Sequence, residues 1–426
     1  MEKLFHLNQK GTSLKQEIMA GLTSFFAISY IIVVNPMILA DAGIPSELSV
    51  FATILASAIG SLLMGLLANA PLVMTPGMGV NAFFTYTIVV SMGLSWQQAL
   101  GVILISSLIF IVISFTNLGM KLAESIPESL KQGITAGIGL FLVMIGLENG
   151  GVIVDGGSHS FVALGNLTDP LVLLTLLGIV LSAVLYLRKV KGSFFIGIIV
   201  ITLLSLVTGS HQPTSSTFSM SQIVEYPQIL GAFDLSAFFS LPFILAVFSM
   251  TMILIFESIG LLEGLLEDKK QFKQAFRVTG IMTVFSGLLG TSPTVVAAES
   301  ASGIKEGGKT GLTSVTVSIL FLLSFVFTPL LTYIPSAALS PVIVITGAIM
   351  MESLKRIDFE DFSEWFPAFL IVVMIPLTSS IVDGLAFGFI AYPLLKMAKG
   401  EFFKIKKMMH VVSFLFFLTM IAIATL

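Results

Sequence analysis

Two segments decide the fold: APLVMTPGMGVNAFF at residues 70–84 and TSPTVVAAESASG at residues 291–303. Each interrupts an apolar stretch with proline, glycine and polar residues. The first segment places four helix-weakening residues within nine positions, at Pro71, Pro76, Gly77 and Gly79. Backbone groups freed in this way persist at membrane depth only where they are buried in protein or line a wet cavity. We therefore expect both segments to be broken helices inside the protein.

The composition around these segments is that of a membrane protein. Of 426 residues, 56% are apolar and only 11% are charged, whereas soluble domains are about a quarter charged. Soluble enzymes, nucleic-acid binders and fibrous proteins are thereby excluded, and a net charge of −3 suggests no anionic partner. With no Cys and four scattered His, the sequence predicts no metal site and no cofactor.

A bilayer core of about 30 Å asks for roughly 20 apolar residues per helix, which gives fourteen windows and one further apolar stretch. Seven precede a polar segment and seven follow it, so the predicted class is an all-α polytopic protein with fourteen transmembrane segments. The first seven windows are 18–40, 49–70, 74–92, 97–117, 128–149, 169–188 and 192–209. The second seven are 240–264, 271–290, 293–304, 311–333, 336–353, 363–380 and 382–397.

The distribution of positive charge supports this count. When the windows are threaded alternately through the membrane, all 21 Lys and Arg residues fall on one side, which the positive-inside rule assigns to the cytoplasm. The mixed-charge N-terminus, 1–17, is then cytoplasmic and is not a cleavable signal. The protein is expected in the inner (cytoplasmic) membrane. For residues 408–426, a fifteenth crossing and a packed or interfacial helix both fit the charges.

The chain divides at the polar segment 210–239, which is expected to be an exported loop. Residues 18–209 and 240–397 form two repeats, and residues 398–426 form a basic linker with a terminal apolar helix. Because each repeat has an odd number of spans, the second is inverted relative to the first. Transporters built in this way bind substrate at mid-membrane, where broken helices from both halves meet. The third and tenth spans are the broken ones here.

Three polar residues lie at depth in or beside the broken helices. Asn81 is one turn into a half-helix that starts near Gly77 and Gly79, so its amide and the backbone N–H groups can meet a ligand. Glu257 and Glu299 are carboxylates within spans, and such groups mark substrate or proton paths. We predict that both glutamates bind substrate and couple its transport to a proton. A packing kink at Asn81, and protonated glutamates bonding neighbouring helices, are the alternatives.

Two further motifs have weaker implications. Phe26 or Tyr30, in the first span, is a candidate for covering a flat ring, and the backbone and side chain of Ser300 are candidates for polar contacts. The Gly-rich run at 303–314 lacks the frame of a phosphate-binding loop, and a cytoplasmic turn is the better interpretation.

These residues resemble a known family. TSFFAISYIIVVNP at 23–36, PGMGVNAFF at 76–84 and GTSPTVVAAESASGIKEGGKTGLT at 290–313 are similar to the purine permeases of the nucleobase–cation symporter-2 group, in its AzgA-like branch. The resemblance implies a core domain (spans 1–4 and 8–11), a gate domain (spans 5–7 and 12–14) and a substrate between half-helices three and ten. It also implies proton-coupled uptake of hypoxanthine, guanine or adenine, with Asn81, Glu257 and Glu299 as polar contacts.

The sequence departs from the family pattern at three places. Glu257 stands where the family has Asp, Lys309 where it has Arg, and Ala297 where it often has Tyr. A carboxylate moved by one methylene can change which base is preferred, because an unpaired donor costs about 1–3 kcal/mol. A carrier of the same fold for uracil, xanthine or an inorganic anion is the alternative, although buried acids oppose an anion. No catalytic dyad supports a membrane-embedded enzyme. The sequence leaves open whether the protein is a homodimer.

Overall fold

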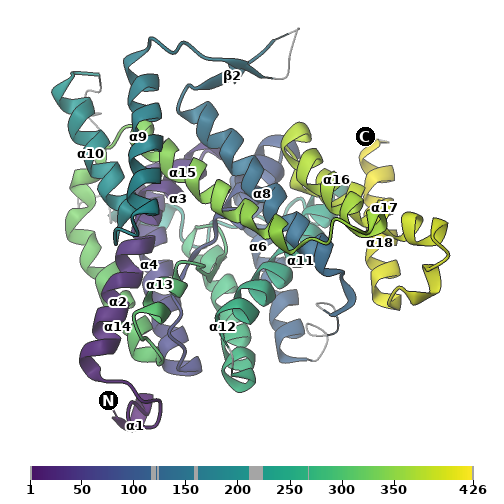
Figure 1. The fold of residues 1–426 in the computed structure, drawn as a ribbon, viewed down its shortest axis with the longest axis horizontal. Coiled ribbons are helices and arrows are strands. Elements are labelled where there is room, and N and C mark those ends of the chain that lie inside the picture. Colours follow the sequence, from purple (N-terminus) through teal and green to yellow (C-terminus); the bar gives the residue numbers. More distant parts are fainter. Residues whose placement is uncertain are drawn as a thin grey trace.

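A computed structural model describes residues 2–116, 121, 124–157, 162–210, 224–266 and 268–424. Helices form nearly all of its body, with the N-terminus and the C-terminal helix at opposite ends (Figure 1). Within this described part, nine helices are long and apolar enough to cross a membrane, and several shorter apolar helices accompany them. The chain is therefore a mainly helical, multi-pass membrane protein.

The first half of the chain runs to the end of α10. Its elements are α1 (Glu2–Phe5), α2 (Leu14–Ile28), α3 (Ile31–Asp41), α4 (Ser46–Leu63), the π-helical turn η1 (Met64–Ala68), β1 (Met74–Pro76), α5 (Met78–Ala82), the π-helical η2 (Phe83–Ser91), α6 (Trp96–Phe115), α8 (Glu128–Asn149), β2 (Ile153–Asp155), β3 (Val162–Leu164), α9 (Pro170–Leu187) and α10 (Ser193–Val207).

The second half begins with a segment that precedes α11. Its elements are the 3-10 turn η4 (Tyr226–Gln228), α11 (Leu241–Leu265), α12 (Lys269–Leu289), β4 (Thr294–Val296), α13 (Ser300–Lys305), α14 (Gly311–Leu323), η5 (Ser324–Tyr333), α15 (Ser336–Met350), η6 (Met351–Arg356), α16 (Phe362–Thr378), α17 (Ile381–Ala398), η7 (Phe402–Lys404) and α18 (Lys407–Ala424).

Most predicted windows coincide with these helices to within a few residues, and the differences lie at the interruptions. The first window is not one continuous helix, because it breaks at Ser29 and Tyr30 between α2 and α3. The window 293–304 is strand β4 followed by the six-residue α13. The expected all-α class thus holds for the body, while the described residues also include two pairs of three-residue strands.

Polar side chains fix where several helices begin. Ser95 and Gln98 form a capping box at α6, in which each side chain bonds the other residue's backbone N–H. Asp169 caps α9, where Pro170 occupies the first helical position. Thr310 caps α14 by accepting from the backbone N–H of Leu312. These bonds satisfy N–H groups that a helix cannot pair internally.

The long helices pack as two groups. In one group, α14 lies against α2 and α4, and α12 lies against α4 and α6, with α3 and α11 completing the set. In the other, α8 lies against α15 and α16, α9 joins α15 to α10, and α17 joins α16 to α18. In Figure 1 the second group runs from α9 and α10 on the left to α16, α17 and α18 on the right, and α2, α12 and α14 of the first group lie lower in the view.

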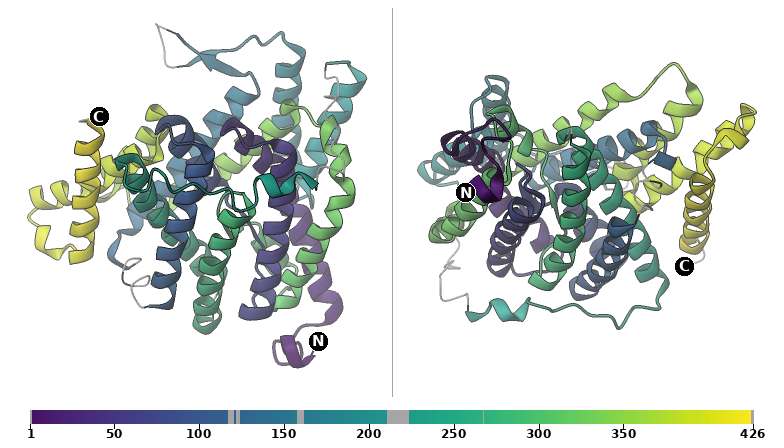
Figure 2. Two further views of the ribbon diagram at one scale, coloured as in Figure 1. Left: turned by 180° about the vertical axis from the view of Figure 1, so that it is seen from behind. Right: turned by 90° about the horizontal axis from the view of Figure 1, so that it is seen from below.

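The segment before α11 crosses the outside of the first group (Figure 2). The hydroxyl of Tyr226 donates to the carbonyl of Leu289 at 2.8 Å, and the N–H of Asp234 donates to the carbonyl of Gln97 at 2.9 Å. Residues 211–223 of the predicted exported loop lie outside the described residues.

The C-terminal apolar stretch forms α18, which packs against α17. The ring of Phe416 contacts the rings of Phe248 and Phe389. The basic linker before α18 is tied down by Lys399, whose hydrogen bond holds the pKa of the Asp361 carboxyl well below its usual range. The linker is therefore anchored to the start of α16.

Helices α8 and α15 meet at two glycines. A Cβ added at Gly139 would lie 2.5 Å from the carbonyl oxygen of Gly347, and one added at Gly347 would lie 2.4 Å from the carbonyl oxygen of Gly139. Small residues at such crossings let helix backbones approach closely in membranes. No side chain fits at either position without moving one helix.

We predict that Gly139→Leu destabilises the protein by about 1–3 kcal/mol or more, because overpacking forces the backbones apart. The measurement is the apparent melting temperature of the detergent-purified protein. Gly264→Ala is the matched control, since a Cβ at Gly264 has nothing within 4 Å. An unchanged melting temperature in Gly139→Leu would contradict the close crossing.

Candidate functional site

A two-stranded ribbon joins the two broken helices inside the protein. Strands β1 and β4 pair antiparallel, with Met74 opposite Val296 and Pro76 opposite Thr294. The pairing continues at both ends, where Gly77 donates to the carbonyl of Pro293 at 3.1 Å and Ala297 donates to that of Val73 at 2.9 Å. The backbone N–H and C=O groups of one unwound segment thus bond those of the other. Such groups must be paired inside the protein, because the bilayer core has no water to bond them.

Serine hydroxyls on neighbouring helices complete the bonding of each strand. The Oγ atom of Ser61, on α4, accepts from the N–H of Met74 at 3.1 Å. The Oγ atom of Ser286, on α12, accepts from the N–H of Thr294 at 2.9 Å. The two strands are therefore held in matching ways by the helix that precedes each of them.

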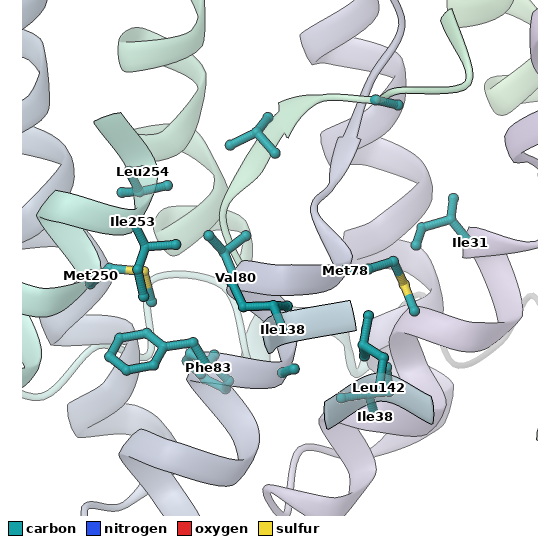
Figure 3. Close-up of a cluster of buried hydrophobic side chains, with 14 of the residues drawn as sticks. Ile31, Ile38, Met78, Val80, Phe83, Ile138, Leu142, Met250, Ile253 and Leu254 are labelled. Carbon is teal, nitrogen blue, oxygen red and sulfur yellow. The ribbon is translucent and has the colours of Figure 1, made fainter. Parts of the chain in front are cut away.

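The half-helix α5 follows β1 and is enclosed by apolar side chains (Figure 3). Met78 points towards Ile31, Ile38 and Leu142, while Val80 and Phe83 lie near Met250, Ile253 and Leu254. All of these side chains are buried. The packing fixes the axis of α5 between α3, α8 and α11, so its N-terminal end keeps one direction.

Glu257, on α11, faces the N-terminal end of α5. Its Oε1 lies 3.3 Å from where a Cβ on Gly77 would stand, and its Oε2 lies 3.6 Å from the equivalent point on Gly79. A Cβ at Gly77 would also approach Val295 to 2.6 Å, so glycine is required there. A helix N-terminus carries unpaired N–H groups and a positive dipole end, which suit a carboxylate or a polar ligand edge. The structure brings Glu257, Gly77 and Gly79 together.

Three polar atoms beside this end of the ribbon lack a partner. They are both amide atoms of the fully buried Asn81 and the Oε2 atom of Glu257. Buried polar groups are nearly always hydrogen-bonded, by protein, water or ligand. These three atoms need a polar ligand or an ordered water as a hydrogen-bond partner.

Glu299 lies beyond the other end of the ribbon, where it precedes α13. The hydroxyl of Tyr30 donates to its Oε1 at 2.5 Å. Tyr30 is only 1% exposed and lies at the break between α2 and α3. The bond across 269 positions of sequence was not expected, because the sequence suggested Tyr30 only as an aromatic cover for a ring.

Two predicted contacts lie elsewhere. Phe26 is 43% exposed and faces Gly192 at the start of α10, so the structure does not bring it to the glutamates. Ser300 is buried, and its hydroxyl donates to the carbonyl of Ala297 at 2.7 Å and accepts from the N–H of Val73 at 2.9 Å. Its backbone N–H also bonds Ala297. Ser300 therefore bonds the scaffold of the ribbon, and its contact with substrate stays a prediction.

Asn35 is a buried residue that the sequence interpretation missed. Its amide nitrogen donates to the hydroxyls of Thr53 at 2.8 Å and Thr291 at 3.0 Å, and its carbonyl oxygen accepts from Ser292 at 3.1 Å. These bonds fix the residues that lead into β4. An asparagine inside the apolar run IIVVNP is a signal that could have identified it.

Other parts of the described structure are weaker candidates for the functional site than the ribbon. Among the described residues, no group of three or more His, Asp or Glu residues could hold a metal ion. Two hollows of about 530 and 450 Å³ lie near Glu124 and Lys406, but they open at the surface and touch neither Glu257 nor Glu299. The unpartnered buried groups identify the candidate site better than these open hollows do.

Two interrupted helices that cross inside a multi-pass helical body, with acids near their ends, define a membrane permease. The chain belongs to the Permease family, which matches residues 15–387. The resemblance inferred from the sequence motifs is thus confirmed, and this membership also supports a transporter rather than an enzyme.

Individual relatives cover most of the chain. It is 45% identical to the nucleobase transporter PlAzg2 of Paenibacillus larvae, over 89% of this chain and 77% of the relative. It is 39% identical to the guanine/hypoxanthine permease PbuO of Bacillus subtilis, over 97% of this chain and 99% of that protein. It is 36% identical to the adenine permease AdeP of Escherichia coli, over 99% and 96%.

The fold is also similar to that of a transporter of a different solute. The transmembrane domain of the cyanobacterium bicarbonate transporter BicA superposes with a TM-score of 0.63 at 16% identity, over 88% of this chain and 97% of that chain. At this identity the likeness concerns the fold alone.

We predict that Ser300→Ala lowers stability rather than substrate affinity. The change strands the buried N–H of Val73, which costs about 1–3 kcal/mol. The measurements are the melting temperature and the KM of uptake, which should stay within about twofold because Ser300 bonds only the scaffold. Ser205→Ala is the control, since the hydroxyl of Ser205 bonds only its own helix and its loss strands no N–H. A large rise in KM with unchanged stability would restore Ser300 as a substrate contact.

Proposed function

We propose that this permease imports a purine base, namely guanine, hypoxanthine or adenine, and couples its uptake to a proton. The names of PlAzg2, PbuO and AdeP support the substrate class. The single observation that carries the proposal is the unpartnered Oε2 of Glu257 at the N-terminal end of α5, a half-helix on which Asn81 carries an unpartnered amide. Carboxylates accept ring and exocyclic N–H groups, while an amide and free N–H groups meet ring acceptors.

We further propose that the chain crosses the membrane fourteen times as two inverted repeats, 18–209 and 240–397, joined by 210–239. Several matched features of the two halves support this. Strands β1 and β4, half-helices α5 and α13, and the serines on α4 and α12 each occur at the same point of the two halves. Residues 1–17 and the linker in 398–426 are assigned to the cytoplasm by their lysines.

The two packed groups of helices correspond to a core and a gate. The group of α2 to α6 and α11 to α14 is the proposed core, and it carries the ribbon and both glutamates. The group of α8 to α10 and α15 to α17 is the proposed gate. Uptake then follows from movement of the loaded core against the gate, with binding energy shifting the balance between the two arrangements.

Glu257 and Glu299 are the proposed proton carriers. A carboxylate at membrane depth is costly when charged, and a bound proton removes the charge before the site moves. Buried acids also oppose an inorganic anion as substrate, because they would repel it unless protonated. Uracil and xanthine remain the alternative solutes that the same experiment tests.

The test is uptake of labelled hypoxanthine, guanine, adenine, uracil and xanthine into bacterial cells that lack their own nucleobase carriers. We expect guanine, hypoxanthine or adenine to accumulate and a protonophore to abolish the accumulation. Accumulation of uracil alone, or of no base, would reject the purine assignment, and accumulation of xanthine alone would reject guanine, hypoxanthine and adenine as the substrates.

We predict that Glu257→Gln and Glu299→Gln each reduce concentrative uptake by tenfold or more, that is by about 1.4 kcal/mol or more of transition-state stabilisation, at unchanged protein abundance in the membrane. Each amide keeps the side-chain shape but cannot carry the proton. Glu225→Gln is the matched control, because Glu225 is an exposed acid ahead of η4. Wild-type uptake in both variants would remove the two glutamates from the mechanism.

A further inference from the structure

The turn between α9 and α10 touches α2 and α13 at three points. A Cβ on Gly192 would lie 3.4 Å from the Cβ of Phe26. The ring of Phe194 meets the ring of Tyr30 edge-on, with centroids 5.6 Å apart. The Nζ of Lys191 lies 2.6 Å from the Oε1 of Glu306. We call these six residues the seam, because they join the α9–α10 pair to the group that contains the ribbon.

Tyr30 is held at both ends of its side chain. Its hydroxyl donates to Glu299, and its ring rests against Phe194, whose other neighbour is the stacked ring of Tyr186 at 6.0 Å. A tyrosine side chain has only two rotatable angles, so its ring and hydroxyl move together. A shift of α10 therefore reaches the hydroxyl and, through it, the carboxylate.

The short helix α13 is contacted by the seam at each of its ends. Glu299 precedes α13 and is bonded by Tyr30, while Glu306 follows α13 and is paired with Lys191. Moving the α9–α10 turn away from α2 must break the Lys191–Glu306 ion pair and the contact between the rings of Phe194 and Tyr30, or carry α13 and Tyr30 with it. The position of Glu299 is thus linked to the position of the turn.

The two glutamates differ in this respect. The Oε1 of Glu299 is occupied by the Tyr30 hydroxyl, whereas the Oε2 of Glu257 has no partner. A ligand can use Glu257 without displacing a protein group, but it competes with Tyr30 for that oxygen of Glu299. Opening of the seam would release this oxygen.

We propose that Tyr30 is a positioning residue that orients Glu299 when the seam is closed and frees it when the seam opens. The proposal deepens the proposed function, because it rests on Glu299 acting in transport. It assigns a role to the first-span tyrosine that is separate from covering a substrate ring.

The seam can be tested by a disulfide, and the chain has no cysteine of its own. The Cβ separation of Phe26 and Gly192 is close to the roughly 3.5–4.5 Å found in disulfides. The parent for the test is Phe26→Cys/Gly192→Cys, oxidised for fixed times and scored by a maleimide-polymer gel shift. The two single-cysteine variants control for strain at position 192, whose φ is +70°.

We expect the parent to cross-link. Adding Tyr30→Phe or Glu299→Ala should slow cross-linking by about tenfold, because each removes the hydrogen bond that holds the Tyr30 ring in place against Phe194 across the seam. Adding Glu257→Ala should leave the rate unchanged, since Glu257 lies at the other end of the ribbon. Failure of the parent to cross-link, or equal rates in all three added variants, would overturn the proposal. Cross-linking is measured without any transport activity. A failure of this proposal can therefore be distinguished from a failure of the proposed function.

Transport gives the second measurement. Oxidation of the parent should stop uptake and reduction should restore it, while both single-cysteine variants stay insensitive to oxidant. Tyr30→Phe and Phe194→Leu should each reduce Vmax/KM. The double variant should have a Vmax/KM no lower than that of the more impaired single variant. Phe110→Leu is the control, because Phe110 lies on α6, outside the seam, and packs on Phe276. Multiplicative losses in the double variant would show two independent effects and overturn the linkage.

Discussion

The constraint on which the structure depends is that backbone N–H and C=O groups cannot stay unpaired in lipid. A transporter needs helix ends at mid-membrane, and each end frees such groups. This chain solves the problem by pairing the two unwound segments with each other, in a ribbon of β1 and β4. Ser61 and Ser286 accept from N–H groups of the two strands, and Ser300 accepts from the N–H of Val73, which precedes β1. Helix packing then holds the ribbon at one depth.

The ribbon also determines what kind of chemistry the site can perform. Its two ends lead into half-helices, and an acid lies near each of them. Glu257 faces the N-terminal end of α5, and its Oε2 has no partner, whereas Glu299 is already held by Tyr30. The two glutamates therefore have different surroundings. Glu257 is available to a ligand, whereas Glu299 is linked through Tyr30 to the neighbouring helices. A site with this asymmetry can respond to binding at one end by a change at the other.

Much of this arrangement could be predicted from the amino-acid sequence. Apolar windows located most helices, because length and hydropathy are set by the bilayer, and the proline and glycine clusters located both interruptions. Glu257, Gly77 and Gly79 came together as expected. The sequence could not show that the freed backbone pairs as strands, since that pairing joins segments about 220 positions apart.

The partners that the sequence did not show have related causes. Ser300 was predicted as a polar contact on the half-helix after Glu299, but a serine hydroxyl can bond backbone as readily as ligand, and only the fold shows that it bonds Val73 and Ala297. Phe26 and Tyr30 were equal candidates in sequence, yet they differ by about one helical turn and lie in different surroundings. Asn35 was visible as a polar residue in an apolar run, although its partners on α4 and before β4 were not.

The ribbon's pairing is made by main-chain atoms, and its outward bonds come from serines on other helices. The side chains of residues 74–76 and 294–296 take no part in the ladder, but all six are buried. Main-chain atoms therefore pair the two strands, while their side chains shape the packed interior around the site. Such a division gives a lineage of carriers room to acquire new cargo preferences while the scaffold that moves the cargo stays the same.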